Sequence, residues 1–158
     1  MAENDKQFMM RAIELAQEGV DKNLGGPFGC VIAKDGRIIG EGCNQVTSSN
    51  DPTAHAEIVA IRDACRSLDT FQLDGCVVYT SCEPCPMCLG AIYWSRPAAL
   101  YIAANRDDAA AVGFDDKTIY DELEKPNDQR GLKMQTLLRD EALKVFQSWE
   151  RKPDKTEY

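Results

Sequence analysis

The sequence is poor in the groups that bind nucleic acid or cross membranes. Its 158 residues contain 18 lysines and arginines against 26 aspartates and glutamates, which gives a formal net charge of −8 and no basic stripe. Because binding to phosphate backbones depends on clustered Lys and Arg, this balance argues against a large nucleic-acid substrate. No apolar run reaches the length of a membrane span. Histidine is almost absent as well, since His55 is the only one.

The chain also shows no basic-then-apolar leader, although it has seven cysteines. An odd number of thiols without an export signal predicts a reducing cytoplasm, with metal-bound and buried free cysteines. The composition, 44% hydrophobic and 28% charged, is that of an ordinary soluble globular protein. No repeat, low-complexity tract or linker divides the sequence, so we expect a single domain over residues 1–158.

Two short motifs carry the chemistry. Thr-Ala-His-Ala-Glu contains His55 and Glu57, and Pro-Cys-Pro-Met-Cys contains Cys85 and Cys88. One imidazole and two thiols are ligands that zinc takes, and three protein ligands leave one open position on a tetrahedral metal. Glu57 is not needed as a ligand and is placed to move protons for a water in that position. The combined pattern, H-x-E with a later P-C-x-x-C, is typical of zinc deaminases.

Helix-start signals accompany both motifs. Cys85 and Cys88 are three residues apart and therefore face the same way on a helix, and Pro86 suits a first helical position. Asp51-Pro52-Thr53 comes just before His55 and indicates a second helix start. Unpaired N–H groups and the helix dipole favour thiolates at such ends. We therefore expect two helix N-termini to point at one metal.

Cys82 leaves two other interpretations open. With Cys85 and Cys88 it forms C-x-x-C-x-x-C, which resembles part of an iron–sulfur run. It could instead complete a closed Cys₃His structural zinc site, in which case the chain would be a binding module and no enzyme. Pro84 opposes the closed site, because it separates an extended Cys82 from the helix that bears the other two thiols.

The order of elements predicts an α/β fold. Helices are predicted at 5–23, 54–68, 86–95, 107–112, 118–123 and 140–151, and strands at 29–33, 37–43, 76–80, 99–103 and 132–136. Asp-Gly at 35–36 predicts a hairpin between the first two strands. Strands separated by helices require parallel crossovers, so we expect a mixed sheet.

Several further segments carry a resemblance to a known family. With Gly25 to Gly29 and Asn44 beside the metal motifs, the chain resembles the cytidine-deaminase-like superfamily. Gly113 to Asp116 and the final Tyr158 make it similar to the bacterial guanine deaminases within that superfamily, over nearly the whole length. The resemblance implies a three-layer α/β/α sandwich around a mixed sheet of about five strands. It also implies hydrolytic deamination of guanine to xanthine and ammonia.

The resemblance further implies a role for each site residue. One Zn²⁺ per subunit would be held by His55, Cys85 and Cys88, with Glu57 as the catalytic proton shuttle. The substrate-binding residues would be Asn44 and Asp116 as hydrogen-bonding groups, Phe28 and Trp94 as pocket walls, and Ala56 and Tyr158. In that family the C-terminal segment closes over the site and is exchanged between two subunits. A homodimer is therefore implied, in which Tyr158 caps the purine base in its own or the other subunit.

Simpler interpretations stand beside these roles. Asn44 could be a turn residue that ends a strand, Asp116 a solvated loop charge, and Tyr158 a frayed terminus. Phe28 and Trp94 could be core residues. Among enzymes, a tRNA adenosine deaminase shares the metal motif but needs basic surface that this acidic sequence lacks. Deaminases of guanosine, cytosine or triazine amines also stay open, since the shape of the pocket sets that choice.

Overall fold

The computed structural model of the chain describes residues 3–158, which form two compact units. The first unit ends at Asp116, and the second comprises Lys117–Tyr158. The first contains the whole sheet and all four residues of the two motifs, whereas the second contains only helical segments and loops. Among the residues described, no helix combines the length and the apolar character that a membrane crossing requires.

The first unit alternates strands and helices, as an α/β fold requires. Its elements are α1 (Glu3–Asp21), β1 (Gly29–Lys34), β2 (Arg37–Cys43), α2 (Val46–Ser49), α3 (Ala56–Leu68), β3 (Val77–Cys82), α4 (Pro86–Ser95), β4 (Ala99–Ala104) and α5 (Arg106–Ala111). The strand order is β2-β1-β3-β4. β1 is antiparallel to β2 and β3, and β3 is parallel to β4. The predicted mixed sheet is confirmed.

The described sheet has four strands, so the expectation of about five is corrected. Alternating apolar residues predicted the fifth strand at 132–136, but this segment forms no regular secondary structure and pairs with no described strand. Leu132 and Met134 are exposed, at 77% and 45%. A strand obtains its hydrogen bonds from a neighbouring strand, and side-chain alternation alone cannot supply them.

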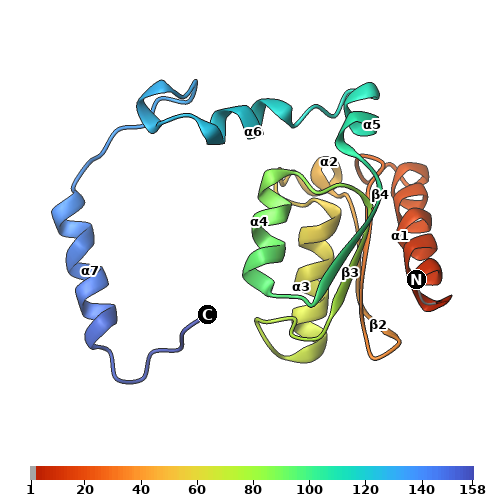
Figure 1. Cartoon of the computed structure of the whole chain (residues 1–158), viewed down its shortest axis with the longest axis horizontal. Helices are drawn as coiled ribbons and strands as arrows, with labels where there is room; N and C mark the ends of the chain where they lie inside the picture. The colour runs from red at the N-terminus through yellow and green to blue at the C-terminus, as the bar shows by residue number, and fades with distance from the viewer. Residues whose placement is uncertain (1–2) are drawn as a thin grey trace. The chain divides into compact units, whose positions relative to one another are not determined.

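Helices cover both faces of the sheet, which gives the three expected layers (Figure 1). Val31 on β1 and Tyr79 on β3 pack with α1 on one face. Ile32 follows Val31 on β1, and Val78 precedes Tyr79 on β3. These two side chains pack with α3 and α4 on the other face. This alternation follows from the two-residue period of a strand, which points successive side chains to opposite faces.

Close packing against β2 fixes the position of α3. A Cβ atom on Gly42 would lie 2.3 Å from the carbonyl oxygen of Ala56, and one on Gly40 would lie 2.6 Å from that of Ala60. The alanines on this side of α3 are fully buried. Glycine therefore lets the two backbones approach each other where a larger residue would separate them. The N-terminus of α3, which follows His55, is held in place by this contact.

Local turn signals agree with the structure in the hairpin and less well after β2. Asp35 and Gly36 adopt positive φ angles of 49° and 74° between β1 and β2, as the Asp-Gly pair predicts. After β2, where no element was predicted, the chain forms the four-residue helix α2. A single helical turn lacks the apolar periodicity that reveals longer helices, so its sequence gives no clear signal.

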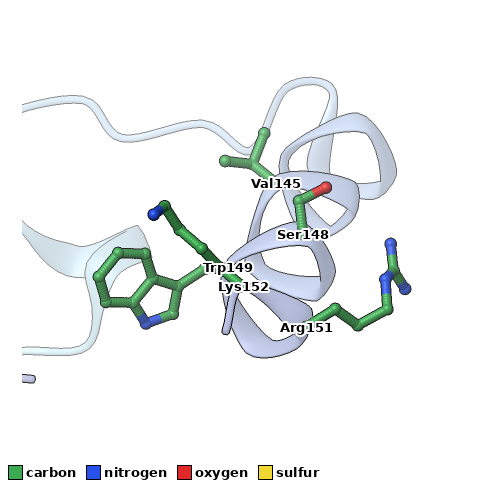
Figure 2. A pocket seen from close by; sticks show the side chains of 5 residues that line it. All are labelled: Val145, Ser148, Trp149, Arg151 and Lys152. Carbon is green, nitrogen blue, oxygen red and sulfur yellow. The ribbon is translucent and has the colours of Figure 1, made fainter. Parts of the chain in front are cut away.

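The second unit consists of α6 (Lys117–Glu124), a 3₁₀ turn (Asn127–Gln129) and α7 (Arg139–Arg151). The terminal helix predicted at 140–151 is confirmed. Its apolar side chains, including Val145 and Phe146, are exposed, and no residue of α7 is buried. A shallow hollow of about 460 Å³ lies beside Val145, Ser148 and Trp149 (Figure 2). Within the described chain, α7 thus presents apolar surface to solvent.

Candidate metal centre and active site

The residues of the two motifs lie at the N-termini of α3 and α4. His55 is the N-cap residue of α3 and Cys85 that of α4, both with extended backbone. Pro86 occupies the first helical position of α4, and Cys88 lies in its first turn. The first turn of a helix offers unpaired N–H groups and the positive end of the helix dipole, both of which stabilise thiolates.

The three side chains are spaced as zinc requires. The His55 Nδ1 atom lies 3.6 Å from the Cys85 Sγ atom and 3.5 Å from the Cys88 Sγ atom. All three donor atoms lie within 4.8 Å of one another. Zinc–sulfur and zinc–nitrogen bonds of ordinary length at tetrahedral angles separate nitrogen from sulfur by about 3.6 Å. The donor set therefore fits zinc in both chemistry and spacing.

The two thiols of this cluster differ strongly in their affinity for a proton. A hydrogen bond from Cys88 lowers the pKa of Cys85 to about 4, and His55 acts in the same direction. The same bond and burial raise the pKa of the Cys88 thiol. Contact with Cys85 raises the pKa of His55. The two thiols thus share one proton, which a divalent cation would displace on binding.

Cys82 is turned away from the cluster. Its Sγ atom donates to the carbonyl oxygen of Asn105, 3.5 Å away. Within residues 3–158, His55, Cys85 and Cys88 are the only His, Cys, Asp or Glu side chains grouped closely enough to hold a metal ion. This geometry opposes the closed Cys₃His site and the iron–sulfur interpretation, because both need the Cys82 thiol at the metal.

Glu57 is buried beside the cluster. It lies in the first turn of α3 with 6% of its surface exposed. Burial raises the pKa of its carboxyl group, and a hydrogen bond with the Cys88 thiol partly offsets that effect. A carboxyl group with increased proton affinity at a metal site can both accept and donate a proton.

Asn44 connects the glycine-rich loop to the end of β2. Only 5% of its surface is exposed, and its Oδ1 atom accepts hydrogen bonds from the N–H groups of Gly26 (3.2 Å) and Val46 (3.1 Å). A Cβ atom on Gly25 would lie 2.2 Å from this oxygen, so the loop requires glycine there. The oxygen of Asn44 is thus engaged by two backbone N–H groups of the protein.

Phe28 packs against an aromatic residue to which the sequence assigned no role. The rings of Phe28 and Phe114 meet edge to face, with centroids 4.9 Å apart. A Cβ atom on Gly26 would lie 3.1 Å from both rings. Phe114 belongs to the Gly-Phe-Asp-Asp segment that carried part of the resemblance. That segment was the sequence feature from which a role for Phe114 could have been predicted. The pair brings residues near 114 beside the glycine-rich loop.

The remaining predicted residues lie in different surroundings. Asp116 is half-buried, and burial followed by the negative charge of Cys85 raises the pKa of its carboxyl group, which places it near the cluster. Ala56 is fully buried between His55 and Glu57. Trp94 is largely exposed in the last turn of α4, six residues or about 9 Å along the helix from Cys88. Tyr158 is largely exposed and belongs to the second unit.

Comparison with known proteins agrees with this site. The family model for the cytidine and deoxycytidylate deaminase zinc-binding region matches residues 2–104, so the chain belongs to this family of zinc-binding deaminases. The chain is 56% identical to the guanine deaminase of Bacillus subtilis (strain 168) over 155 residues, which are 98% of this chain and 99% of that protein. The X-ray structure of guanine deaminase from Bacillus subtilis matches with a TM-score of 0.95 and 55% identity, covering 100% and 99% of the two chains.

A second relative acts on a different substrate. The tRNA-specific adenosine deaminase of Haemophilus influenzae is 40% identical over 122 residues, which are 73% of this chain and 69% of that protein. Both relatives are deaminases, in agreement with the deaminase zinc-binding region that this chain matches. The metal of this chain is therefore zinc, and His55, Cys85 and Cys88 form the cluster that fits it.

Proposed function

We propose that the chain hydrolyses guanine to xanthine and ammonia. The observation that carries this proposal is the full-length similarity to a guanine deaminase, which includes the segments beyond the zinc-binding region. The tRNA-specific adenosine deaminases are less similar, at 40% identity over 73% of this chain in one relative and 35% over 92% in another. The net charge of −8 also suits a small uncharged base better than a polyanion.

We assign the metal-binding role to His55, Cys85 and Cys88. When bound, zinc supplies Lewis-acid chemistry that makes a water nucleophilic near neutral pH. Two thiolates and one neutral imidazole balance the charge of the ion, so this site acidifies water less than an all-histidine site does. A neighbouring base is then needed, and Glu57 is the buried carboxyl group beside the cluster.

Glu57 would transfer the protons of the reaction. It accepts a proton from the attacking water and donates it to a ring nitrogen of guanine, and it then takes the remaining proton of the added hydroxyl group and delivers it to the departing amine. Water supplies the oxygen of xanthine, the carbon–nitrogen bond of the amine breaks, and ammonia leaves. Burial suits Glu57 to this task because it brings the pKa of the carboxyl group closer to neutral pH.

The purine would be held by groups around the cluster. The NH₂ group of Asn44 and the carboxylate of Asp116 provide a donor and an acceptor, and such directed bonds discriminate strongly between related bases. Phe28 offers an aromatic wall that Phe114 supports from the side. Ala56, in the first turn of α3, contributes backbone groups near His55. We assign Trp94 to the outer wall of the same pocket.

We further propose a cytoplasmic homodimer that acts in purine breakdown, in which each chain forms one deaminase domain. The C-terminal segment of one subunit would complete the site of the other, with Tyr158 of the partner subunit as a cap over the base. Two features support this: α7 has exposed apolar side chains, and the strand-like segment at 132–136 pairs with no described strand. A second copy would cover such surfaces.

Ammonia release from a panel of substrates tests the proposed activity. We expect guanine to be the preferred substrate over guanosine, adenine, cytosine and ammeline, with one zinc per chain by metal analysis. A minimal tRNA stem-loop with a target adenosine completes the panel. Turnover of that adenosine without turnover of guanine would instead identify the chain as a tRNA deaminase.

A Glu57→Gln change tests the proton-transfer role. The amide keeps the size of the side chain but cannot accept the proton, so we expect kcat to fall by about 10²–10⁴ with zinc still bound. Glu14→Gln, on the exposed side of α1, is the matched control and should keep normal activity. Near-normal turnover by a zinc-loaded Glu57→Gln protein would rule out this role.

A further inference from the structure

An ion pair joins the metal-binding loop to the start of α5. The Oε1 atom of Glu83 accepts hydrogen bonds from the Nε (3.1 Å) and Nη2 (2.5 Å) atoms of Arg106. The Oε2 atom of Glu83 accepts from the backbone N–H of Arg106 at 3.1 Å. We call these three contacts the Glu83–Arg106 clamp. Glu83 lies two residues before Cys85, so the clamp begins on the loop that carries the zinc ligands.

The other end of the clamp leads to the proposed purine-binding segment. Arg106 is the first residue of α5. A capping box between Asn105 and Asp108 caps the N-terminus of this helix. The helix ends at Ala111, and Gly113 turns the chain with a φ of 95°. The N–H of Phe114 bonds to the carbonyl of Ala109 at 3.0 Å. A short, capped helix thus connects the clamp to Phe114 and to the residues just after it.

Residues 105–116 are therefore anchored at both ends. Arg106 fixes the first end on the metal-binding loop, and Phe114 fixes the second on Phe28. Asp116 follows two residues after the second anchor. Movement at either anchor would shift the Asp116 carboxylate relative to the zinc ligands, because the intervening helix is only six residues long and capped at its N-terminus.

The clamp is better suited to positioning than to stability. The Glu83 and Arg106 side chains are 25% and 42% exposed, and ion pairs with such access to solvent contribute little to folding. Charge-assisted bonds from a planar guanidinium nevertheless fix direction well. Small displacements of substrate-binding groups can reduce catalytic efficiency strongly even when the fold is intact.

We propose that Arg106 is a positioning residue for purine recognition, because the Glu83–Arg106 clamp holds the Asp116 segment at a set distance from the metal cluster. This inference rests on the proposed function. The clamp does not touch the reacting atoms, so its effect should fall on substrate affinity more than on the chemical step. Guanine binds with full affinity only when the Asp116 carboxylate meets its N–H groups while its amino-bearing carbon lies at the metal.

Steady-state kinetics of Arg106→Gln with guanine test this inference. We expect kcat/KM to fall about 10- to 100-fold, mainly through KM, with one zinc per chain retained. Arg106→Lys keeps the positive charge but loses the forked geometry, and should give an intermediate KM. In Glu83→Gln/Arg106→Gln, the losses should not add, since either change alone already removes the ion pair between the two side chains.

Arg11→Gln provides the matched control. Arg11 forms a similar forked pair with Glu41, at 2.8 and 3.3 Å, between α1 and β2. Its removal should leave the KM for guanine unchanged. If Arg106→Gln does not fold, the KM of Arg106→Lys decides, and a wild-type value overturns the inference.

Two results with Arg106→Gln would also overturn it. One is an unchanged KM, and the other is a loss of zinc that accounts for the loss of activity. A wild-type protein that does not deaminate guanine would instead overturn the proposed function. The panel of substrates therefore tests the proposed function and the Arg106 variants test the positioning role, so that either proposal can be overturned without the other.

Discussion

Asn44 would, in the function we propose, serve the fold and the substrate at once. Its oxygen accepts bonds from Gly26 and Val46, and we propose that its NH₂ group binds the purine. We predict that Asn44→Asp keeps the acceptor but loses the donor, so kcat/KM for guanine should fall about 10²-fold or more. Asn44→Ala also leaves two N–H groups unpaired, which should cost about 1–3 kcal/mol of stability.

Comparing the two variants separates these tasks. Thermal unfolding should show a larger loss of stability for Asn44→Ala than for Asn44→Asp, while both lose activity with guanine. Normal turnover by Asn44→Asp would mean that the amide does not contact the base, and that Asn44 serves only to hold the loop after β2.

The position of a single side chain could be predicted from the sequence where the spacing of residues along the chain alone determines which side chains lie together. Cys85 and Cys88 fall on one helical face because they are three residues apart, and Pro86 marks the helix start. The clamp partner of Glu83 could not be found in this way. Arg106 lies 23 residues later, and only the parallel pairing of β3 with β4 brings the two together.

The same distinction holds for whole elements. The helices that carry the metal site were predicted to within two residues, because caps, prolines and apolar periodicity act over a few residues. The predicted strand at 132–136 was wrong for the described chain, since pairing is a long-range property. Close approach of α3 to β2 was also invisible in the sequence, although Gly40 and Gly42 make it possible.

A change at Gly42 tests how this packing positions the metal site. In Gly42→Ala the new methyl group would lie 2.3 Å from the carbonyl oxygen of Ala56. The N-terminus of α3 must then move, and His55 and Glu57 move with it. We predict a loss of about 1–3 kcal/mol in the free energy of unfolding, together with weaker zinc binding in competition with a chelator.

Gly90→Ala is the control for this prediction. Gly90 lies within α4, and a Cβ atom there would meet nothing within 4 Å. Alanine in a helix interior is favoured over glycine by about 0.5–1 kcal/mol, so this variant should be at least as stable as the wild type. If Gly42→Ala bound zinc as tightly as Gly90→Ala, the contact between β2 and α3 would not be what places His55.

At the scale of the whole molecule, the acidic composition agrees with the class of substrate that we propose. A net charge of −8 disfavours a polyanion but hardly affects a neutral base. The division into two units could not be read from the sequence, because no linker composition marks residue 117. The second unit buries no side chain of α7, which agrees with our proposal that a second copy of the chain covers this helix.

A complementation experiment tests whether the C-terminal segment serves the other subunit. A chain that lacks residues 156–158 should lose affinity for guanine because Tyr158 is absent, and a Glu57→Gln chain should lose turnover. In a heterodimer with exchanged segments, the truncated subunit keeps Glu57 and receives an intact tail from its partner. Random pairing makes about half of the dimers mixed, each with one working site, so co-expression should restore about one quarter of wild-type activity.

Chains that use their own tails give a different result. A mixed dimer then has one site without Tyr158 and one without Glu57, and its activity cannot exceed that of the two parent homodimers. Co-expression of two Glu57→Gln chains, one of them truncated, controls for activity from any other source. Full activity of the truncated chain alone would show that Tyr158 does not contact the substrate, whichever subunit supplies it. Recovery in the mixed dimer requires that the site be shared between two chains, because no single chain in that sample contains both residues.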